Sequence, residues 1–224
     1  MPPLIPFNAR AASTLRWKLG MAPEHVAHGV RASYGMTHVT PEHITAWERG
    51  AVLPTASELA ALAAALWCSP GDLMGRPRTL FEYRLSRGVA AEDVARTVGV
   101  PVDAYLQMEQ AGRWVGDKMQ SARLGEFFQL PPSDFIAITG LQDELARLLV
   151  EAVTTRWQAH IKDIAKLTAI DKRDLKEPLR SMHQEYQAIM AATLGRAIGA
   201  AAGEEGRRYL DSIVDRLWEW FPEV

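Results

Sequence analysis

Histidines form the densest group of metal-ligand residue types in this chain of 224 residues. Four of the six histidines lie between positions 25 and 43. His25 and His28 are three residues apart, which puts both imidazoles on one face of a helix, and His38 or His43 would complete a metal site. No cysteine or carboxylate cluster joins them, so we favour a solvated face that meets phosphate when protonated and expect no metal.

Catalytic patterns are absent from the sequence. It contains no Gly-rich phosphate loop, no His-Glu-x-x-His and no nucleophile elbow. Two acid–base pairs, His160 with Asp163 and His183 with Glu185 or Asp174, are of a kind expected by chance among many charged helical positions. The single cysteine, Cys68, follows apolar residues and is interpreted as a small buried hydrophobe. We therefore expect neither an enzyme nor a cofactor.

The composition is that of an ordinary folded protein, with 48% hydrophobic residues, 23% charged residues and a net charge of −2. This balance excludes wholesale disorder, and no apolar run approaches the roughly twenty residues of a membrane-spanning helix. The Pro-broken opening is too short for a secretory leader, so we expect a cytoplasmic protein. A protein that coats nucleic acid would be clearly basic, and this one is not.

Helical periodicity dominates the first seventy residues, and each helix has a recognisable start or stop. Asn8 caps a helix that ends before Gly20, Pro23 opens a second, and Thr40-Pro41 opens a third that ends at Gly50. A fourth helix is expected over 57–66 and a short fifth over 70–73. Helices this short are too weak to stand alone, so they must share a core.

The same order of residue types then occurs a second time. Gly88 lies 68 residues after Gly20, whereas Glu109 lies 61 residues after Glu48. The first copy therefore carries seven extra residues, which fall between Ala27 and Thr40. An internal duplication with one insertion is the simplest account.

The third helix of the first copy carries a family resemblance. Its run Ile44-Thr45-Ala46-Trp47-Glu48-Arg49-Gly50 closely resembles the end of the recognition helix in the Cro/lambda-repressor (xenobiotic-response-element) family of helix-turn-helix regulators. The second copy matches more loosely, and together the copies cover about residues 8–140. The overall layout is similar to that of two-headed regulators of actinobacteria.

The resemblance implies a role for each matching residue. The helix from Thr40 to Arg49 would read base edges in the major groove. Candidate DNA contacts in this copy are Thr40, Glu42, His43, Thr45 and Arg49. Pairs that brace each copy internally would be Arg16 with Glu48 and Arg84 with Glu109.

The sequence departs from the family pattern at two places. The insertion either lengthens the second helix by about two turns or replaces the tight turn by a loop. The second copy keeps the tight turn, but its reading helix offers few hydrogen-bonding groups, so only Arg113 and Lys118 are candidate phosphate contacts there. This copy either contacts DNA or serves as a scaffold or partner surface.

From Leu141 onward the sequence predicts three longer amphipathic helices: one through Trp157, one over 175–198 and one over 207–221, with loops at 169–173 and 199–206. Their apolar faces would form a homodimer interface, enclose an effector pocket, or simply pack on the second copy, in that order of preference. The candidate pocket lining is Trp157, His183, Tyr186, Tyr209 and Trp218.

Taken together, the sequence predicts an all-α protein with two tandem five-helix, lambda-repressor-like helix-turn-helix domains, at 8–77 and 78–140, and a C-terminal helical module at 141–224. The expected function is sequence-specific binding of double-stranded DNA in transcription regulation, as a homodimer, with a small-molecule or protein effector and no membrane partner. The alternative is a protein-interaction adaptor that kept the helix-turn-helix fold without DNA binding. A steep fall of affinity with salt would distinguish the first from the second.

Overall fold

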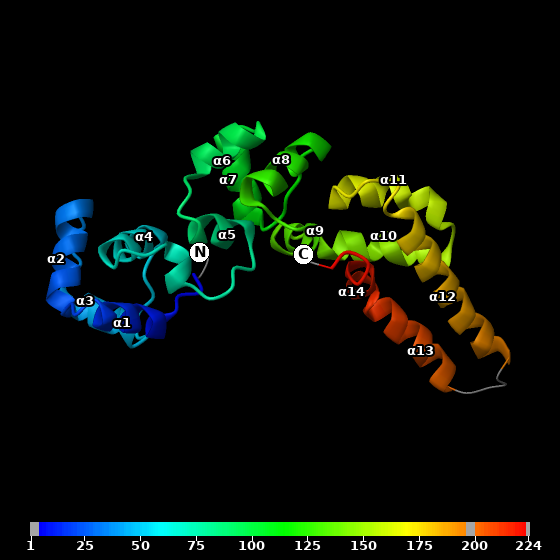
Figure 1. The fold of residues 1–224 in the computed structure, drawn as a ribbon, viewed down its shortest axis with the longest axis horizontal. Helices are drawn as coiled ribbons and strands as arrows, with labels where there is room; N and C mark the ends of the chain where they lie inside the picture. Colours follow the sequence, from blue (N-terminus) through cyan, green and yellow to red (C-terminus); the bar gives the residue numbers. More distant parts are fainter. Residues whose placement is uncertain (1–4, 196–199, 223–224) are drawn as a thin grey trace. The chain divides into compact units, whose positions relative to one another are not determined.

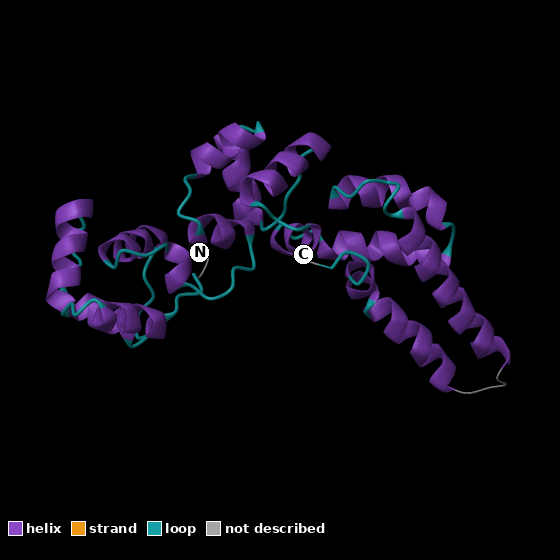
Figure 2. Ribbon diagram, in the orientation of Figure 1, coloured by secondary structure: helices purple, strands orange, loops and turns teal. Residues whose placement is uncertain are grey.

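The computed structural model describes residues 5–195 and 200–222, and it confirms the all-α fold. Across these residues the regular elements are helices, joined by loops, and the only β-type pairing is an isolated bridge between Phe7 and Met74 (Figure 2). No helix in this part of the chain is both long and apolar enough to span a membrane.

The helices follow one another along the chain as labelled in Figure 1. Their bounds are α1 Ala9–Lys18, α2 Pro23–Tyr34, α3 Pro41–Glu48, α4 Ala56–Ala65, the 3₁₀ turn η1 Pro70–Leu73, α5 Leu80–Ser86, α6 Ala91–Val98, α7 Val102–Ala111, α8 Lys118–Phe128, α9 Pro132–Ile138, α10 Gln142–Thr154, α11 Trp157–Thr168, α12 Lys176–Gly195, α13 Ala200–Asp211 and α14 Ile213–Trp218.

The chain divides into two compact units. Unit 1 comprises Met1–Arg96 with Val100–Gly112, and unit 2 comprises Thr97–Gly99 with Arg113–Val224. The division falls inside the second sequence repeat, so that α5 and α7 belong to unit 1 whereas α8 and α9 belong to unit 2.

The core of unit 1 gathers one apolar face from each of its first helices. Val26 on α2, Ile44 and Trp47 on α3, and Leu59 and Leu62 on α4 are all at most 2% exposed. Side chains close the helix starts: Asn8 accepts the Ala11 N–H at 3.0 Å, and Thr55 accepts the Glu58 N–H at 3.3 Å. The Asn8 cap was predicted from the sequence, whereas the Thr55 cap was not, and α4 begins at Ala56, one residue before its expected start.

Both repeats use glycine in the same backbone conformation. Gly20 and Gly88 follow α1 and α5 with φ of +65° and +66°, and Gly50 and Gly112 follow α3 and α7 with φ of +66° and +64°. Other residues rarely adopt this left-handed conformation. The repeated glycines therefore end equivalent helices in the same way.

The insertion of the first copy is divided between a helix and a loop. Helix α2 has 12 residues where α6 has 8, so four of the seven extra residues add about one helical turn. The other three lengthen the connection to the next helix, which runs over 35–40 in the first copy and over 99–101 in the second. Each of the two alternatives from the sequence therefore holds in part.

The C-terminal part of unit 2 differs from the expected three helices. The predicted helix through Trp157 is interrupted after Thr154, because Thr155 leaves the helical region with φ −124° and ψ −111°. The hydroxyls of Thr154 and Thr155 donate to the Val150 and Glu151 carbonyls, a backbone contact that competes with helix continuation. Two helices, α10 and α11, therefore replace one.

The prediction of a loop at 199–206 is also wrong for residues 200–206, because α13 begins at Ala200. Position 199 and the predicted end of the preceding helix, 196–198, lie outside the described residues. Gly206 is a buried helical residue, and a Cβ there would lie 3.4 Å from the Met190 sulfur of α12. The glycine thus permits close helix packing instead of marking a loop. The helix expected over 207–221 is interrupted too, with α13 ending at Asp211 and α14 beginning at Ile213.

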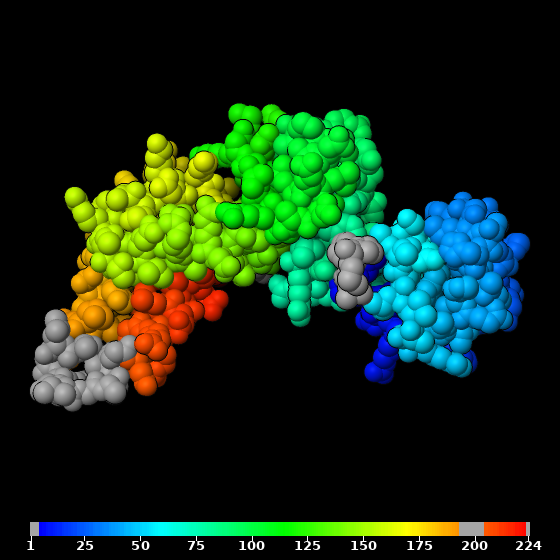
Figure 3. All heavy atoms as spheres, turned by 180° about the vertical axis from the view of Figure 1, so that it is seen from behind, coloured from blue at the N-terminus to red at the C-terminus, as the bar shows by residue number. Residues whose placement is uncertain are grey.

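Four of these helices surround one apolar core. Helix α10 packs against α11, α12 and α14, and the space-filling view shows α10 (yellow-green) beside α14 (red) (Figure 3). Fully buried side chains come from each of them: Leu145 and Leu149, Ile164, Leu179 and Leu217. These apolar side chains therefore pack against one another inside the unit.

Candidate functional site

Helix α3 of unit 1 separates its side chains into a buried face and an exposed face. Ile44 and Trp47 are each 1% exposed and lie in the core of unit 1. Glu42, His43 and Arg49 are exposed on the surface. A short helix with polar groups along its outer face is what contact with a nucleic-acid groove requires.

The first turn of α3 is ordered by His43. The Thr40 backbone N–H donates to His43 Nδ1 at 3.3 Å, and Thr40 Oγ1 lies 3.1 Å from the same nitrogen. The imidazole ring contacts the His38 ring edge-on at 6.4 Å between centroids and the Trp47 ring at 6.5 Å. These contacts fix the ring with Nδ1 turned inward and leave Nε2 as the nitrogen for a ligand.

Glu42 is a carboxylate prepared to accept hydrogen bonds. The Thr40 hydroxyl, followed by the residue's own backbone N–H, lowers the pKa of this fully exposed carboxyl below its usual value. Glu42 is therefore ionised at neutral pH. A carboxylate repels phosphate but accepts well from an exocyclic amine such as that of cytosine.

The other two candidates of the first copy differ in availability. The Thr45 hydroxyl donates to the Pro41 carbonyl at 3.0 Å, so its only hydrogen is used inside the helix. Arg49, at the C-terminal end of α3, is exposed. Of these two side chains, Arg49 is therefore the more accessible donor.

The predicted braces are present in both copies. Arg16 Nε and Nη2 donate to the two oxygens of Glu48 at 2.6 and 2.7 Å, and Nη1 donates to the Met21 carbonyl at 2.8 Å. The hydrogen bonds that Arg16 donates to Glu48 raise the pKa of Arg16. With both side chains 11% exposed, the pair joins α1 to α3 as a partly desolvated, bidentate contact.

Arg84 makes the same contacts to Glu109, at 2.6 and 2.9 Å, and its Nη1 donates to the Val89 carbonyl at 2.9 Å. Burial disfavours the charged guanidinium, but Glu109 outweighs burial and raises the pKa of Arg84. Tyr105, at the position of Ile44, buries its hydroxyl beside Arg84 and Glu109, but without a hydrogen bond of good geometry to either.

The phosphate candidates of the second copy lie in unit 2. Arg113 Nη2 donates to Glu144 at 2.6 Å, so this guanidinium is already engaged with a carboxylate. Lys118 is the exposed first residue of α8, directly after the capping Asp117. Helix α7 itself exposes Asp103, Leu106 and Gln107, which provide no positive charge.

The insertion loop, residues 35–40, is held against α2 and α4 by Arg31 and Glu58, which the sequence did not single out. Arg31 Nη1 donates to the Val39 carbonyl at 2.8 Å, and His38 Nε2 lies 2.8 Å from Glu58 Oε1. Glu58 also accepts the Thr55 N–H at 2.8 Å, a capping contact that the Thr-x-x-Glu pattern signals. Nothing in the sequence signals the Arg31 contact, because a carbonyl acceptor can belong to any residue.

The four clustered histidines make separate contacts. His25 Nδ1 accepts the Ala22 N–H at 3.1 Å, His28 is exposed, His38 faces Glu58, and His43 orders the start of α3. Among the described residues, no group of three or more histidine, cysteine, aspartate or glutamate side chains is arranged to hold a metal ion.

Cys68 lies half-buried after α4, and its thiol donates weakly to the Ala63 carbonyl at 3.5 Å. Burial, together with the nearby Asp72, raises the pKa of the thiol to about 11. The thiolate is therefore scarce at neutral pH, which leaves Cys68 a poor nucleophile.

Three of the five residues expected to line a pocket, His183, Tyr186 and Tyr209, make packing or hydrogen-bond contacts within unit 2. The Tyr209 hydroxyl donates to the Met182 carbonyl at 2.9 Å, and the Tyr209 ring lies 5.8 Å from that of Tyr186. His183 Nδ1 lies 2.9 Å from the Val153 carbonyl oxygen. A cavity between α10 and α11 has a different lining that includes none of the five expected residues, among them Trp157 and Trp218.

Comparison with known proteins adds no relative: no family model matches the sequence, and neither a curated protein nor a solved structure is similar to this chain.

Proposed function

We propose that this protein is a cytoplasmic transcriptional regulator that binds double-stranded DNA sequence-specifically, with α3 lying in the major groove. The observation that carries the proposal is the division of α3 into a buried face, locked by Arg16 and Glu48, and an exposed face with Glu42 and His43 at its first turn. Eight helical residues span about 12 Å, comparable with the width of the groove.

The chemistry of this face suits base edges better than phosphates. Glu42 would accept from a cytosine amine, and His43 Nε2 would bond a purine edge. Arg49 would contact the backbone near the end of the helix. A carboxylate in a groove lined by phosphates is unfavourable unless a base donates a hydrogen bond to it. Glu42 therefore contributes to base specificity more than to overall DNA affinity.

Charge limits how tightly one copy binds. The chain carries a net charge of −2, and the outer face of α3 contributes one arginine. One copy of α3 on DNA would release few counterions, so its affinity should fall only gradually with salt. The slope of log affinity against log salt concentration is about one unit per phosphate contact. Two readers on a palindromic site would double the contacts, so we extend the proposal to a homodimer on DNA.

The test is selection from a random DNA pool with the purified full-length protein, followed by affinity measurement at two salt concentrations. A recovered motif whose affinity falls with salt supports the proposal, and a palindromic motif supports the dimer. A matched variant is His43→Ala, which should relax the preference at one base position, against His28→Ala on the neighbouring helix as control. Absence of enrichment by a folded protein would contradict DNA binding.

A second candidate function is a protein-interaction adaptor. The exposed aromatic residues of unit 1 favour it, because Trp17 is 75% and Trp67 is 86% exposed. If an apolar partner surface covers them, Trp17→Ser and Trp67→Ser should abolish that association, and added salt should leave it unchanged.

A further inference from the structure

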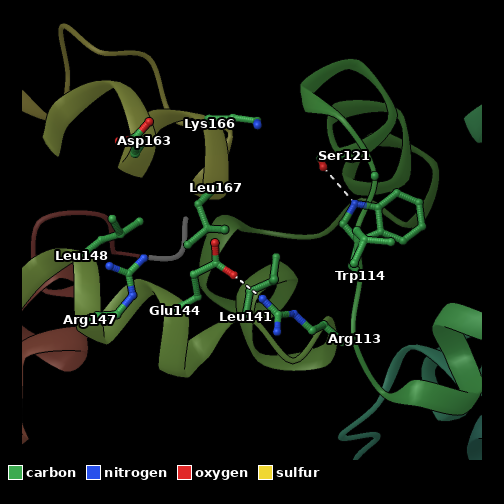
Figure 4. A pocket seen from close by; sticks show the side chains of 12 residues that line it. Arg113, Trp114, Ser121, Leu141, Glu144, Arg147, Leu148, Asp163, Lys166 and Leu167 are labelled. Atoms are coloured by element: carbon green, nitrogen blue, oxygen red, sulfur yellow. Dashed lines mark hydrogen bonds and ion pairs between the residues drawn. The ribbon is translucent and has the colours of Figure 1, made fainter.

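A cavity of about 340 Å³ lies within unit 2, separate from α3. Its walls are α10, α11, the start of α8 and the segment Arg113–Gly116 (Figure 4). The volume is at the lower end of the range that holds small metabolites.

One wall is fixed before any ligand arrives. Trp114 is 3% exposed, its backbone N–H donates to the Thr139 carbonyl at 2.9 Å, and its indole N–H donates to Ser121 Oγ at 2.9 Å. A Cβ at position 116 would lie 2.3 Å from the Trp114 ring, so only glycine fits where the chain folds over the indole. The segment is therefore a preformed wall, which lowers the entropic cost of binding.

The lining combines an apolar surface with one exposed cation, Lys166, that has no carboxylate partner among the described residues. Leu141, Leu148 and Leu167 contribute the apolar part. Arg113 is paired with Glu144 at 2.6 Å, and Arg147 is paired with Glu151 at 2.7 Å.

Lys166 has no carboxylate at ion-pair distance within the described part of the chain. It extends across the cavity toward the side of Ser121 in Figure 4. The Ser121 oxygen accepts the indole N–H, which leaves the hydroxyl hydrogen for an acceptor in the cavity. An ammonium and a hydroxyl that line the same cavity offer two donors to one carboxylate group.

We propose that this cavity binds a small organic monocarboxylate with a compact apolar body. The carboxylate accepts from Lys166 and Ser121, while the body covers the leucine surface. Asp163, three residues before Lys166 on α11 and also part of the lining, disfavours a second negative charge. The site therefore selects monocarboxylates over dicarboxylates of similar size. This inference goes beyond the proposed function and does not depend on it.

The experiment titrates the full-length protein, without DNA, with benzoate and octanoate and with their uncharged amides. The readout is the NMR resonance of the Trp114 indole N–H, identified by its loss in Trp114→Phe. We expect saturable shifts with the carboxylates, binding at least tenfold weaker for the amides and for phthalate, and about tenfold weaker carboxylate binding in Lys166→Met.

Lys162→Met is the matched control, since it removes an exposed lysine of the same helix that does not line the cavity. Thermal melting establishes that both variants fold. Equal binding of acid and amide, equal effects of the two lysine variants, or no shift of the indole resonance at millimolar carboxylate would each overturn the proposal. None of these outcomes bears on DNA binding, which is measured separately.

Discussion

Arg16 and Glu48, 32 residues apart in sequence, meet through two parallel hydrogen bonds that close the first helical repeat. The second repeat reproduces this geometry between Arg84 and Glu109, down to the third guanidinium nitrogen, which in both copies binds the carbonyl five residues further on. Two copies of one three-point contact support the internal duplication that the sequence spacing predicts.

Breaking this pair should destabilise unit 1 strongly. Glu48→Ala leaves the Arg16 charge partly desolvated, and we expect a loss of about 3 kcal/mol in opening free energy. Hydrogen exchange of the α2–α4 amides measures this loss without assuming two-state unfolding of two units. The double variant Arg16→Met/Glu48→Leu should recover most of the loss. A double variant less stable than Glu48→Ala, or an equal loss in Glu92→Ala on the surface, would contradict this account.

Two buried tyrosines should respond in opposite directions to loss of the hydroxyl. The Tyr105 hydroxyl lies beside Arg84 and Glu109 without a hydrogen bond of good geometry, whereas that of Tyr209 donates to the Met182 carbonyl. Tyr105→Phe should leave stability unchanged or raise it by about 1 kcal/mol, and Tyr209→Phe should lower it by about 1 kcal/mol. Hydrogen exchange of α5–α7 and of α12–α13 reports the two effects separately, and a clear loss in Tyr105→Phe would show that its hydroxyl is bonded.

Acid should weaken unit 1 through Glu58. Burial alone would raise the pKa of this carboxyl, but the Thr55 N–H and His38 together lower it below the usual 4.5. The folded protein then binds this proton less readily than the unfolded chain, so the stabilisation is present above pH 4.5 and is lost as the pH falls through the folded pKa.

Glu58→Gln should therefore lower the stability of unit 1 at neutral pH and flatten its acid dependence below about pH 5, as followed by hydrogen exchange of α4. Glu92→Gln, an exposed carboxylate of α6, is the control and should change neither quantity. If the stability of Glu58→Gln still falls with decreasing pH as in the unmodified protein, another group is responsible for the acid dependence.

Arg49 should carry the phosphate contact of α3. If DNA binds as proposed, Arg49→Gln should weaken affinity for all sequences about equally and reduce the salt slope by about one. Thr45→Ala should have little effect, because its hydroxyl is bonded to the Pro41 carbonyl. Binding measured at a series of salt concentrations separates the two, and a larger effect of Thr45→Ala would reverse the assignment.

Local signals explain why the first helices were predictable. Asn8, Thr55 and Ser69 cap helices, Pro23 and Pro41 begin them, and left-handed glycines end them. The preference of each of these residue types for a helix end depends on the backbone within a few residues, so it can be predicted from the sequence. The Arg16–Glu48 pair was predictable only through the family resemblance, because 32 residues separate its members.

Tertiary packing decided the rest. Gly206 resembles a loop residue in the sequence, yet it lies buried in α13, in close contact with the Met190 sulfur. The aromatic residues of α12 and α13 were candidates for a pocket, but the structure buries Tyr209 against α12 and forms its cavity beside Trp114. For the first helices of unit 1, the sequence determined their approximate positions, several of their caps and the repeated order of residues, because these depend on local chemistry. Which faces meet, and where space is left between them, depends on contacts between residues far apart in the chain, and only the folded structure specifies those.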